Sequence, residues 1–233
     1  VVIEDKPSAE DEAEVKNNIS VLVDSLRLTT KNQEFVDAKS DIKYDSTYIT
    51  KKNLPTQFAE QLYNLPTGEV FGPYIFNGYY AVTKALGKRS GASAKASHIL
   101  IAYQGSKTPN PAITRTKEEA QAKANDLLAQ IQANPAVFEA LVPGNSDDSG
   151  SAQNRGEYDG ITPGQMVKPF DDFVFNKPIG SLGIVETEFG FHIIKITDKQ
   201  DGVRLATVAQ KVEASEATSD KVFTQATKFE MDA

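Results

Sequence analysis

The 233-residue chain contains no cysteine, no long hydrophobic run and no block of basic residues. Absence of cysteine fits a periplasmic protein that avoids stray disulfides, and it fits many cytosolic proteins equally well. No apolar run approaches the roughly 18 residues that a membrane-spanning helix needs, so no span is expected in this segment. Because 25 basic residues stand against 32 acidic ones, for a net charge of −7, nucleic acid is not an expected partner.

Histidine is also scarce, and both copies occupy the same kind of surroundings. His98 lies in "KASHILIA" and His192 in "EFGFHIIKIT". Each run is rich in the small, aromatic and β-branched apolar residues that are typical of a buried strand. A single histidine in such a strand is more often a hydrogen-bonded core residue than a functional one, and that alternative stays open at this point.

The length favours two domains. Ser8 is a predicted N-cap for helical periodicity that continues to residue 39, and a short helix near Pro55 precedes two strands. Residues 87–97, which are small and basic, predict a flexible linker. After it we expect a strand at 96–102, a helix at 117–131 capped by Thr116, and a short helix at 136–142. A long loop at 143–164, a helix at 165–176 and two strands at 183–187 and 189–197 are expected to follow.

The two halves resemble each other. Residues 54–80 align without a gap on 166–192, and glycines and prolines recur at the turn positions where backbone geometry demands them. We interpret this as a tandem repeat with units at 1–90 and 91–201. Residues 202–233 are expected to begin a further unit or to form a C-terminal extension.

The second unit resembles the parvulin-type, or PpiC-like, peptidyl-prolyl cis-trans isomerases. The motifs that carry the resemblance occur in family order between residues 96 and 198: "ASHILI", "TKEEAQAKA", "FEALV", "NSDDSGSAQNRGE", "GQMVKPFDDFVF" and "VETEFGFHIIKI". Tandem parvulin-like units are similar to periplasmic folding factors of the SurA and PpiD type. The resemblance implies an α+β fold in which each unit has a four-stranded antiparallel sheet flanked by helices.

The resemblance also assigns roles to matching positions. His98 and His192 correspond to the paired cleft histidines of the family, and Thr187 to the hydroxyl residue that bonds the inner one. Asp148 falls where the family has cysteine or aspartate, although Asp147 adjoins it and leaves one residue of uncertainty. The walls of the proline pocket correspond to Met166 and Phe170.

Two departures from the family pattern concern the pocket. Tyr158 stands where a leucine normally closes it, and Phe189 adds a second large ring near the rim, so either residue could narrow the site. The loop 103–116 has only Lys107 and Arg115 as basic residues, so the phosphate-reading cluster of one parvulin branch is missing. We therefore expect substrates to be unphosphorylated polypeptides that contain X-Pro bonds.

Catalysis of X-Pro isomerisation requires only a modest reduction of the rotational barrier. The rotational barrier of an X-Pro bond is near 20 kcal/mol, and lowering it by roughly 3 to 4 kcal/mol brings the reaction below a second. A dry pocket that favours the twisted amide suffices, so no cofactor, metal or covalent intermediate is expected. A metal site of two histidines and a carboxylate, or a Ser-His-Asp hydrolase, is a weaker alternative because ligand spacing and the G-x-S-x-G elbow are missing.

The serious rival is a peptide-binding chaperone with little isomerase activity. In the first unit the gap-free alignment puts Tyr80 at the position of His192 and Leu54 at that of Met166, which predicts an inert unit that serves as scaffold or client surface. Exposed tyrosines of this unit would suit apolar peptide contacts, and core packing of several of them is an equal alternative: Tyr44, Tyr48, Tyr74, Tyr79 and Tyr80. The expected location is the periplasm, in a segment of a longer protein that could be anchored through residues outside this sequence.

Overall fold

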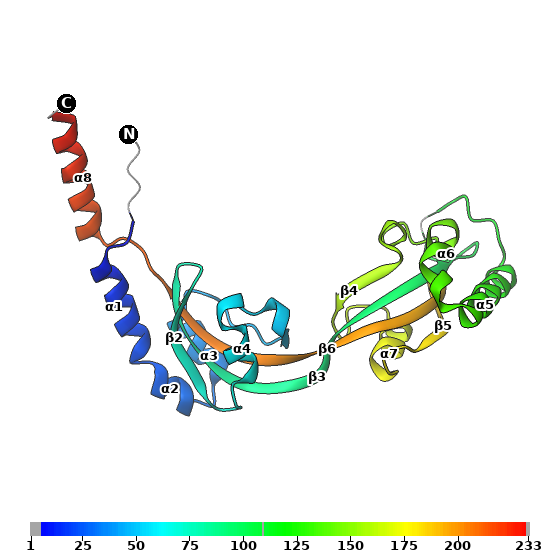
Figure 1. Ribbon diagram of the computed structural model, residues 1–233, viewed down its shortest axis with the longest axis horizontal. Helices are drawn as coiled ribbons and strands as arrows, with labels where there is room; N and C mark the ends of the chain where they lie inside the picture. The colour runs from blue at the N-terminus through cyan, green and yellow to red at the C-terminus, as the bar shows by residue number, and fades with distance from the viewer. Residues whose placement is uncertain (1–5, 109, 232–233) are drawn as a thin grey trace. The chain divides into compact units, whose positions relative to one another are not determined.

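The computed structural model describes residues 6–108 and 110–231, and it divides the chain into two compact units (Figure 1). The flanking unit comprises Val1–Arg89 together with Gly202–Ala233, and the inserted unit comprises Ser90–Asp201. Residues 202–231 therefore group with the first part of the chain, which differs from the separate unit or C-terminal extension expected from the sequence. Two long strands, β3 (Tyr79–Ile101) and β6 (Gly190–Lys211), contribute to both units.

The predicted linker is wrong because residues 87–97 lie within β3. Their small side chains pack instead of remaining free. Ala94 and Ala96 are buried in a cluster with Phe170 and Val174, and Ala94 pairs with Ile161 of strand β4 (Glu157–Ile161). The small side chains suggested flexibility in the sequence, but here they let the helix that carries Phe170 and Val174 pack closely on β3.

In the flanking unit the single predicted N-terminal helix is three helices, α1 (Ala9–Ser20), α2 (Val23–Leu28) and α3 (Asn32–Lys39). The predicted N-cap is confirmed, since the Ser8 hydroxyl accepts a hydrogen bond from the Asp11 amide and the Asp11 carboxylate accepts one from the Ser8 amide. The remaining α-helices and strands of this unit besides the long strands are β1 (Ile49–Thr50), α4 (Ala59–Asn64), β2 (Val70–Phe76) and α8 (Glu216–Met231). Two 3-10 helices lie between β1 and α4, at Lys51–Asn53 and Thr56–Phe58.

The strands of the flanking unit follow the order β1-β6-β3-β2, and the described pairs β1–β6 and β2–β3 are antiparallel. Alternate residues of β3 enter different cores, as the two-residue period of a strand requires. Ala81 and Ala85 pack in a cluster with Leu54 and Leu62, whereas Val82 packs with residues of α1 to α3. The sheet is thus covered on both faces.

The inserted unit has the strand order β4-β3-β6-β5, and the pairs β3–β4 and β5–β6 are antiparallel. Its other α-helices and strands are α5 (Lys117–Ala133), α6 (Phe138–Asn145), β4 (Glu157–Ile161), α7 (Lys168–Asn176) and β5 (Leu182–Thr187). The Thr116 N-cap is confirmed by a capping box with Glu119. The predicted α+β fold, with an antiparallel sheet flanked by helices, is therefore confirmed.

The loop predicted at 143–164 is only partly irregular. The end of α6, a short 3-10 helix at Ala152–Asn154 and the whole of β4 lie within it. A strand this short, with glycine and acidic residues among its five positions, carries almost no periodic signal. The irregular part that remains, between α6 and β4, contributes side chains to the site described below.

The hairpins of the two units share a shape but differ in register. A two-residue turn joins β5 to β6 between the paired residues Thr187 and Gly190, and another joins β2 to β3 between Phe76 and Tyr79. Relative to the gap-free alignment, the turn of the flanking unit therefore comes one residue later. An irregularity in the pairing between Phe71 and Tyr74 takes up the extra residue.

This slip changes which residue matches His192. His192 pairs with Val185 two positions beyond the turn-closing pair, and the corresponding residue of the flanking unit is Ala81, which pairs with Tyr74. Tyr80 lies on the other face of β3, against the cluster of Val82. The predicted equivalence of Tyr80 and His192 is wrong by one residue, because a one-residue shift in a strand moves a side chain to the opposite face.

Candidate active site

The two histidines lie side by side on neighbouring strands of the inserted unit. His98 of β3 is 3% exposed and His192 of β6 is 5% exposed. Their Nδ1 atoms are 3.1 Å apart, and the rings are nearly parallel, with an interplanar angle of 15°. Residues 94 positions apart in sequence thus form one hydrogen-bonded pair.

Two backbone contacts hold these strands in place, and both require glycine. The amide of His98 donates to the carbonyl of Gly156 at 2.8 Å, and a Cβ on Gly156 would lie 2.1 Å from the carbonyl oxygen of His98. A Cβ on Gly190 would lie 2.4 Å from the carbonyl oxygen of Ile101. Both glycines also have positive φ, at 71° and 137°. Sequence reasoning did not single out either glycine for the site.

Asp148, rather than Asp147, faces the histidines. Its Oδ2 lies 2.8 Å from Nε2 of His98, while Asp147 accepts a hydrogen bond from the Ala102 amide at 2.9 Å and pairs with Arg115. The structure thus places Asp148, and not Asp147, beside His98.

Ser151 is a site residue that the sequence reasoning missed. It is 1% exposed, donates to Oδ2 of Asp148 at 2.5 Å and lies 3.0 Å from Nε2 of His98. The only signal available was its place three residues after Asp148 in "NSDDSGS", where a serine is also an ordinary turn residue.

The hydrogen bonds fix the protons when both imidazoles are neutral. Hydrogen bonding to His98 above all, and also to Ser151 and Tyr158, lowers the pKa of Asp148 far below its usual range, so its carboxylate only accepts. His98 then donates from Nε2 and accepts at Nδ1 from His192. The remaining nitrogen of His192 accepts from the hydroxyl of Thr187 at 2.7 Å.

Burial, reinforced by the neighbouring His98, lowers the pKa of His192 to about 3. His192 is therefore uncharged near neutral pH. The backbone amide of Phe189 donates to Thr187 at 3.1 Å, which completes a line of hydrogen bonds from the turn between β5 and β6 to Asp148. All four residues expected to form the polar side of the site, His98, Asp148, Thr187 and His192, lie in this line.

A cavity of about 560 Å³ opens beside the two imidazoles. Phe170 of α7 is 2% exposed and presents its ring edge-on to both, with centroid distances of 5.6 Å. Met166 also lines the cavity, but it lies before the start of α7 at Lys168. The helix predicted at 165–176 therefore begins later than expected, and Met166 and Phe170 are not on one helix. Apolar walls thus meet the polar line at the histidines.

The two departures from the family pattern also line this cavity. Tyr158 of β4 turns its hydroxyl to Oδ2 of Asp148 at 2.8 Å, and its ring lies 5.3 Å from that of His98. Burial, with the hydrogen bond to Asp148, raises the pKa of Tyr158 to about 12. Phe189 lies in the turn between β5 and β6. Both rings form walls, and neither fills the space.

The basic residues of the loop at the cavity rim are paired. Lys107 lies 2.7 Å from the carboxylate of Glu188, and Arg115 pairs with Asp147. Among residues 6–108 and 110–231, no group of three His, Cys, Asp or Glu side chains is arranged to hold a metal ion. Over the same residues, no helix is both long and apolar enough to cross a membrane.

Comparison with known proteins identifies the family. The family described as "PPIC-type PPIASE domain" matches residues 80–200, which contain both histidines and the whole cavity lining. The chain belongs to this family. PPIase denotes peptidyl-prolyl isomerase, so the inserted unit is a PpiC-type, or parvulin-type, isomerase domain.

Curated relatives of this parvulin-type chain are named "Chaperone SurA". The protein from Alcanivorax borkumensis is 30% identical over 175 residues, which cover 72% of this chain and 38% of the relative. That from Chromohalobacter salexigens is 34% identical, with 63% of this chain and 34% of the relative covered. The chain thus spans about a third of the length of these relatives.

Among solved structures, "Peptidyl-prolyl isomerase ESS1 from Candida albicans" is 29% identical to this chain. The match covers 46% of this chain and 63% of that one, with a TM-score of 0.44.

Proposed function

We propose that the inserted unit catalyses cis-trans isomerisation of X-Pro bonds in unphosphorylated polypeptides. The observation that carries the proposal is the hydrogen-bonded pair of His98 and His192, 3.1 Å apart, at the edge of an apolar cavity. A prolyl ring fits against Met166 and Phe170 while the imide bond lies over the imidazoles. Tyr158 and Phe189 bind the same substrate from the remaining walls.

Catalysis on this proposal is non-covalent. The imide bond loses resonance as it twists, its carbonyl becomes less polar and its nitrogen more pyramidal. A site that excludes water and offers the paired imidazoles, with His192 uncharged, favours this state over the planar amide, and only such differential binding accelerates the reaction. About 3 to 4 kcal/mol is needed, which is a small fraction of what enzymes achieve.

The polar line has a positioning role. Thr187 hydrogen-bonds Nε2 of His192, and Asp148 hydrogen-bonds Nε2 of His98. Both rings therefore keep one tautomer and one orientation. The ionised Asp148 lies behind His98 and keeps a negative charge near the site without itself reacting. His98, His192, Thr187 and Asp148 together preorganise the surface against which the amide turns.

The ion pairs at the rim of the cavity indicate which charge is favoured on the substrate. Since Lys107 and Arg115 are each held in an ion pair, neither is free to bind a phosphate group without losing its carboxylate partner. Extended polypeptides with a neutral residue before proline are therefore the substrates favoured. In view of the relatives named "Chaperone SurA", the process served is the folding of exported proteins in the periplasm.

The second candidate is a chaperone that holds extended clients with little turnover. The name of the curated relatives favours it, and so does the replacement of the usual pocket-closing leucine by Tyr158. The two functions make separable demands, because holding a client needs the apolar walls whereas isomerisation also needs the histidine pair.

A protease-coupled assay on the 233-residue chain with a Leu-Pro or Phe-Pro peptide tests the proposal. We expect turnover above buffer that falls at least tenfold in His98→Ala and in Met166→Ala. Asp126→Asn, on the exposed surface of α5, is the matched control and should keep wild-type turnover. Wild-type turnover equal to buffer, with aggregation suppression intact, would leave only the chaperone function.

A further inference from the structure

Two arginines of the flanking unit lie against one tyrosine ring. The guanidinium carbon of Arg204, on β6, is 5.6 Å from the ring centroid of Tyr48, and that of Arg89, on β3, is 5.9 Å from the same centroid. Arg89 is exposed, and Arg204 and Tyr48 are partly buried. The ring therefore holds two guanidinium groups at one accessible place on the surface of this unit.

Neither of these arginines has an acidic partner. The other three arginines of the chain each pair with a carboxylate: Arg27, Arg115 and Arg155. Within the part of the chain that the structure describes, no ion pair joins Arg89 or Arg204 to an Asp or Glu side chain. Asp45, which precedes the tyrosine by three residues, accepts a hydrogen bond from the amide of Thr47 instead. Two positive charges thus stay uncompensated in a chain whose net charge is −7.

Two buried polar atoms beside the tyrosine also lack a partner. Nε of Arg204 and Oγ1 of Thr50 are both buried, and neither makes a hydrogen bond to any described residue. The Nε–H group can only donate, and the threonine hydroxyl can donate as well. Because buried polar groups are normally hydrogen-bonded, these two donors indicate an acceptor that the flanking unit does not itself supply.

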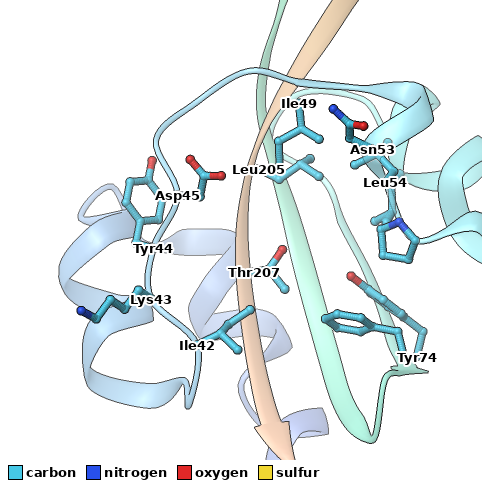
Figure 2. Close-up of a pocket in the computed structure, with 13 residues that line it drawn as sticks. Ile42, Lys43, Tyr44, Asp45, Ile49, Asn53, Leu54, Tyr74, Leu205 and Thr207 are labelled. Carbon is cyan, nitrogen blue, oxygen red and sulfur yellow. The ribbon is translucent and has the colours of Figure 1, made fainter. Parts of the chain in front are cut away.

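The strand register puts both donors on one face of the sheet. Thr50 pairs with Gly202 in an antiparallel ladder, and Arg204 lies two residues further along β6, so the two side chains are diagonal neighbours on the same face. Ile49 and Leu205 alternate with them and line a pocket on the other face, which Figure 2 shows. One acceptor placed over β6 can therefore reach Thr50 and Arg204 together.

The set of donors favours a phosphate group over a carboxylate. A guanidinium group presents its N–H donors as a planar fork, and a single fork is enough to occupy both oxygens of a carboxylate. Here two forks and a hydroxyl surround one ring, and a tetrahedral phosphate has enough oxygens to accept from all three. Since the net charge of −7 repels anions at long range, recognition depends on these short-range contacts.

We infer that Tyr48, Thr50, Arg89 and Arg204 form a binding site for a phosphate group, carried either by inorganic phosphate or by a lipid headgroup. Arg204 and Thr50 donate to its oxygens, Arg89 adds a second positive charge, and the ring of Tyr48 orients both guanidinium groups. The site goes beyond the proposed isomerase function, because it lies in the flanking unit and requires neither proline nor the histidine pair.

Side-chain signals of the arginines in ¹⁵N-labelled chain test the site directly. We expect the Nε–H signals of Arg89 and Arg204 to shift saturably with inorganic phosphate, and not with sodium chloride at the same ionic strength. Acetate should bind at least fivefold more weakly than phosphate. Equal or tighter binding of acetate, or shifts of the same size in all arginines of the chain, would overturn the inference.

Two variants separate the guanidinium fork from charge alone. Arg204→Lys keeps the positive charge but removes the fork, and Lys16→Met removes one positive charge from the exposed surface of α1. We expect Arg204→Lys to weaken phosphate binding at least fivefold and Lys16→Met to leave it within twofold. The amide spectrum of the inserted unit should be unchanged in both variants, which shows that they fold. Equal affinity for phosphate in Arg204→Lys and wild type would overturn the inference.

Vesicles distinguish the two sources of the phosphate group. The full chain is sedimented with vesicles of phosphatidylglycerol and phosphatidylcholine, and with vesicles of phosphatidylcholine alone as the uncharged control. Sedimentation with the anionic vesicles that Arg204→Lys reduces assigns the site to a lipid headgroup, whereas phosphate-induced shifts without sedimentation assign it to inorganic phosphate. Absence of both would overturn the inference, whether or not the inserted unit proves to be an active isomerase.

Discussion

Oδ2 of Asp148 accepts a hydrogen bond from the hydroxyl of Tyr158 at 2.8 Å, and the same oxygen faces His98. A leucine at position 158, which the family pattern has, could not donate there. The departure that seemed from sequence to narrow the pocket therefore also adds a donor to the network behind the histidines.

Removing the charge of Asp148 should reduce turnover. In Asp148→Asn the side chain keeps its shape, but its hydrogen bonds to His98, Ser151 and Tyr158 lose their charged acceptor. With one charge-assisted hydrogen bond lost from the network, worth about 1.5 kcal/mol, kcat/KM is expected to fall about tenfold. The assay is steady-state isomerisation at pH 7, with Asp126→Asn as control. Wild-type kcat/KM in Asp148→Asn would show that this carboxylate only shapes its loop.

Removing the hydroxyl of Tyr158 should have a smaller effect. Tyr158→Phe keeps the ring over His98 and loses one donor to Asp148, at a cost of about 1 kcal/mol, so kcat/KM should fall about fivefold. Tyr158→Leu also removes the ring and should raise KM further. If Tyr158→Phe and Tyr158→Leu behave alike, the hydroxyl is the contribution that matters and the ring is dispensable as a wall.

The stability of the inserted unit should depend on pH through His192. Its folded-state pKa, about 3, lies below the unfolded value near 6.5, so the unfolded chain binds more protons between these values. This contribution to stability is therefore complete above pH 6.5 and is lost as the pH falls toward 3. Between pH 7 and pH 5 the loss amounts to about 2 kcal/mol.

Urea unfolding of wild type and His192→Gln at both pH values measures this loss. We expect the variant, whatever its stability at pH 7, to lose about 2 kcal/mol less than wild type on acidification. Equal losses in the two proteins would mean that His192 titrates normally, and hence that it is not buried against His98 as described.

The adjacent residues Arg155 and Gly156 both have positive φ, at 57° and 71°, but only one is a glycine. Arg155→Gly should stabilise the unit by up to about 1 kcal/mol, because the left-handed conformation strains any residue with a Cβ. Arg155→Ala keeps that strain and is the control for the exposed ion pair with Glu139. Thermal unfolding checks both, and a Gly variant less stable than the Ala variant would contradict the strain argument.

Gly156→Ala should have the opposite effect. Its new Cβ would meet the carbonyl oxygen of His98 at 2.1 Å, so the strand that carries the histidine has to move. Stability and isomerase turnover should fall together. Retention of both would show that β3 and β4 can separate without disturbing the pair of imidazoles.

Several of these features were predictable from sequence. Short motifs in family order located His98 and His192, and the capping boxes at Ser8 and Thr116 fixed where two helices begin, since each depends only on residues three positions apart. The α+β class followed from the resemblance to the parvulin-type isomerases that these motifs carry. These signals depend on residues close together in the chain, so they can be recognised from the sequence alone.

What could not be predicted depends on contacts between distant residues. The linker at 87–97 proved to be strand because Ala94 and Ala96 are covered by α7, and residues 202–211 returned to the flanking unit because Val203 pairs with Ile49. Ser151 entered the site only when β4 and the preceding loop brought it to His98. Of the five tyrosines for which exposure and core packing were equal alternatives, Tyr74 is buried and the other four are partly buried, since their rings pack on strands and helices.

Exchange spectroscopy on a Ser-Pro peptide, unphosphorylated and phosphorylated, tests the central claim most directly, because it detects cis-trans turnover without a coupling enzyme. With the 233-residue chain we predict catalysed exchange on the unphosphorylated peptide, no gain on the phosphorylated one, and loss of catalysis in His98→Ala. Exchange at the buffer rate for the unphosphorylated peptide would contradict the account.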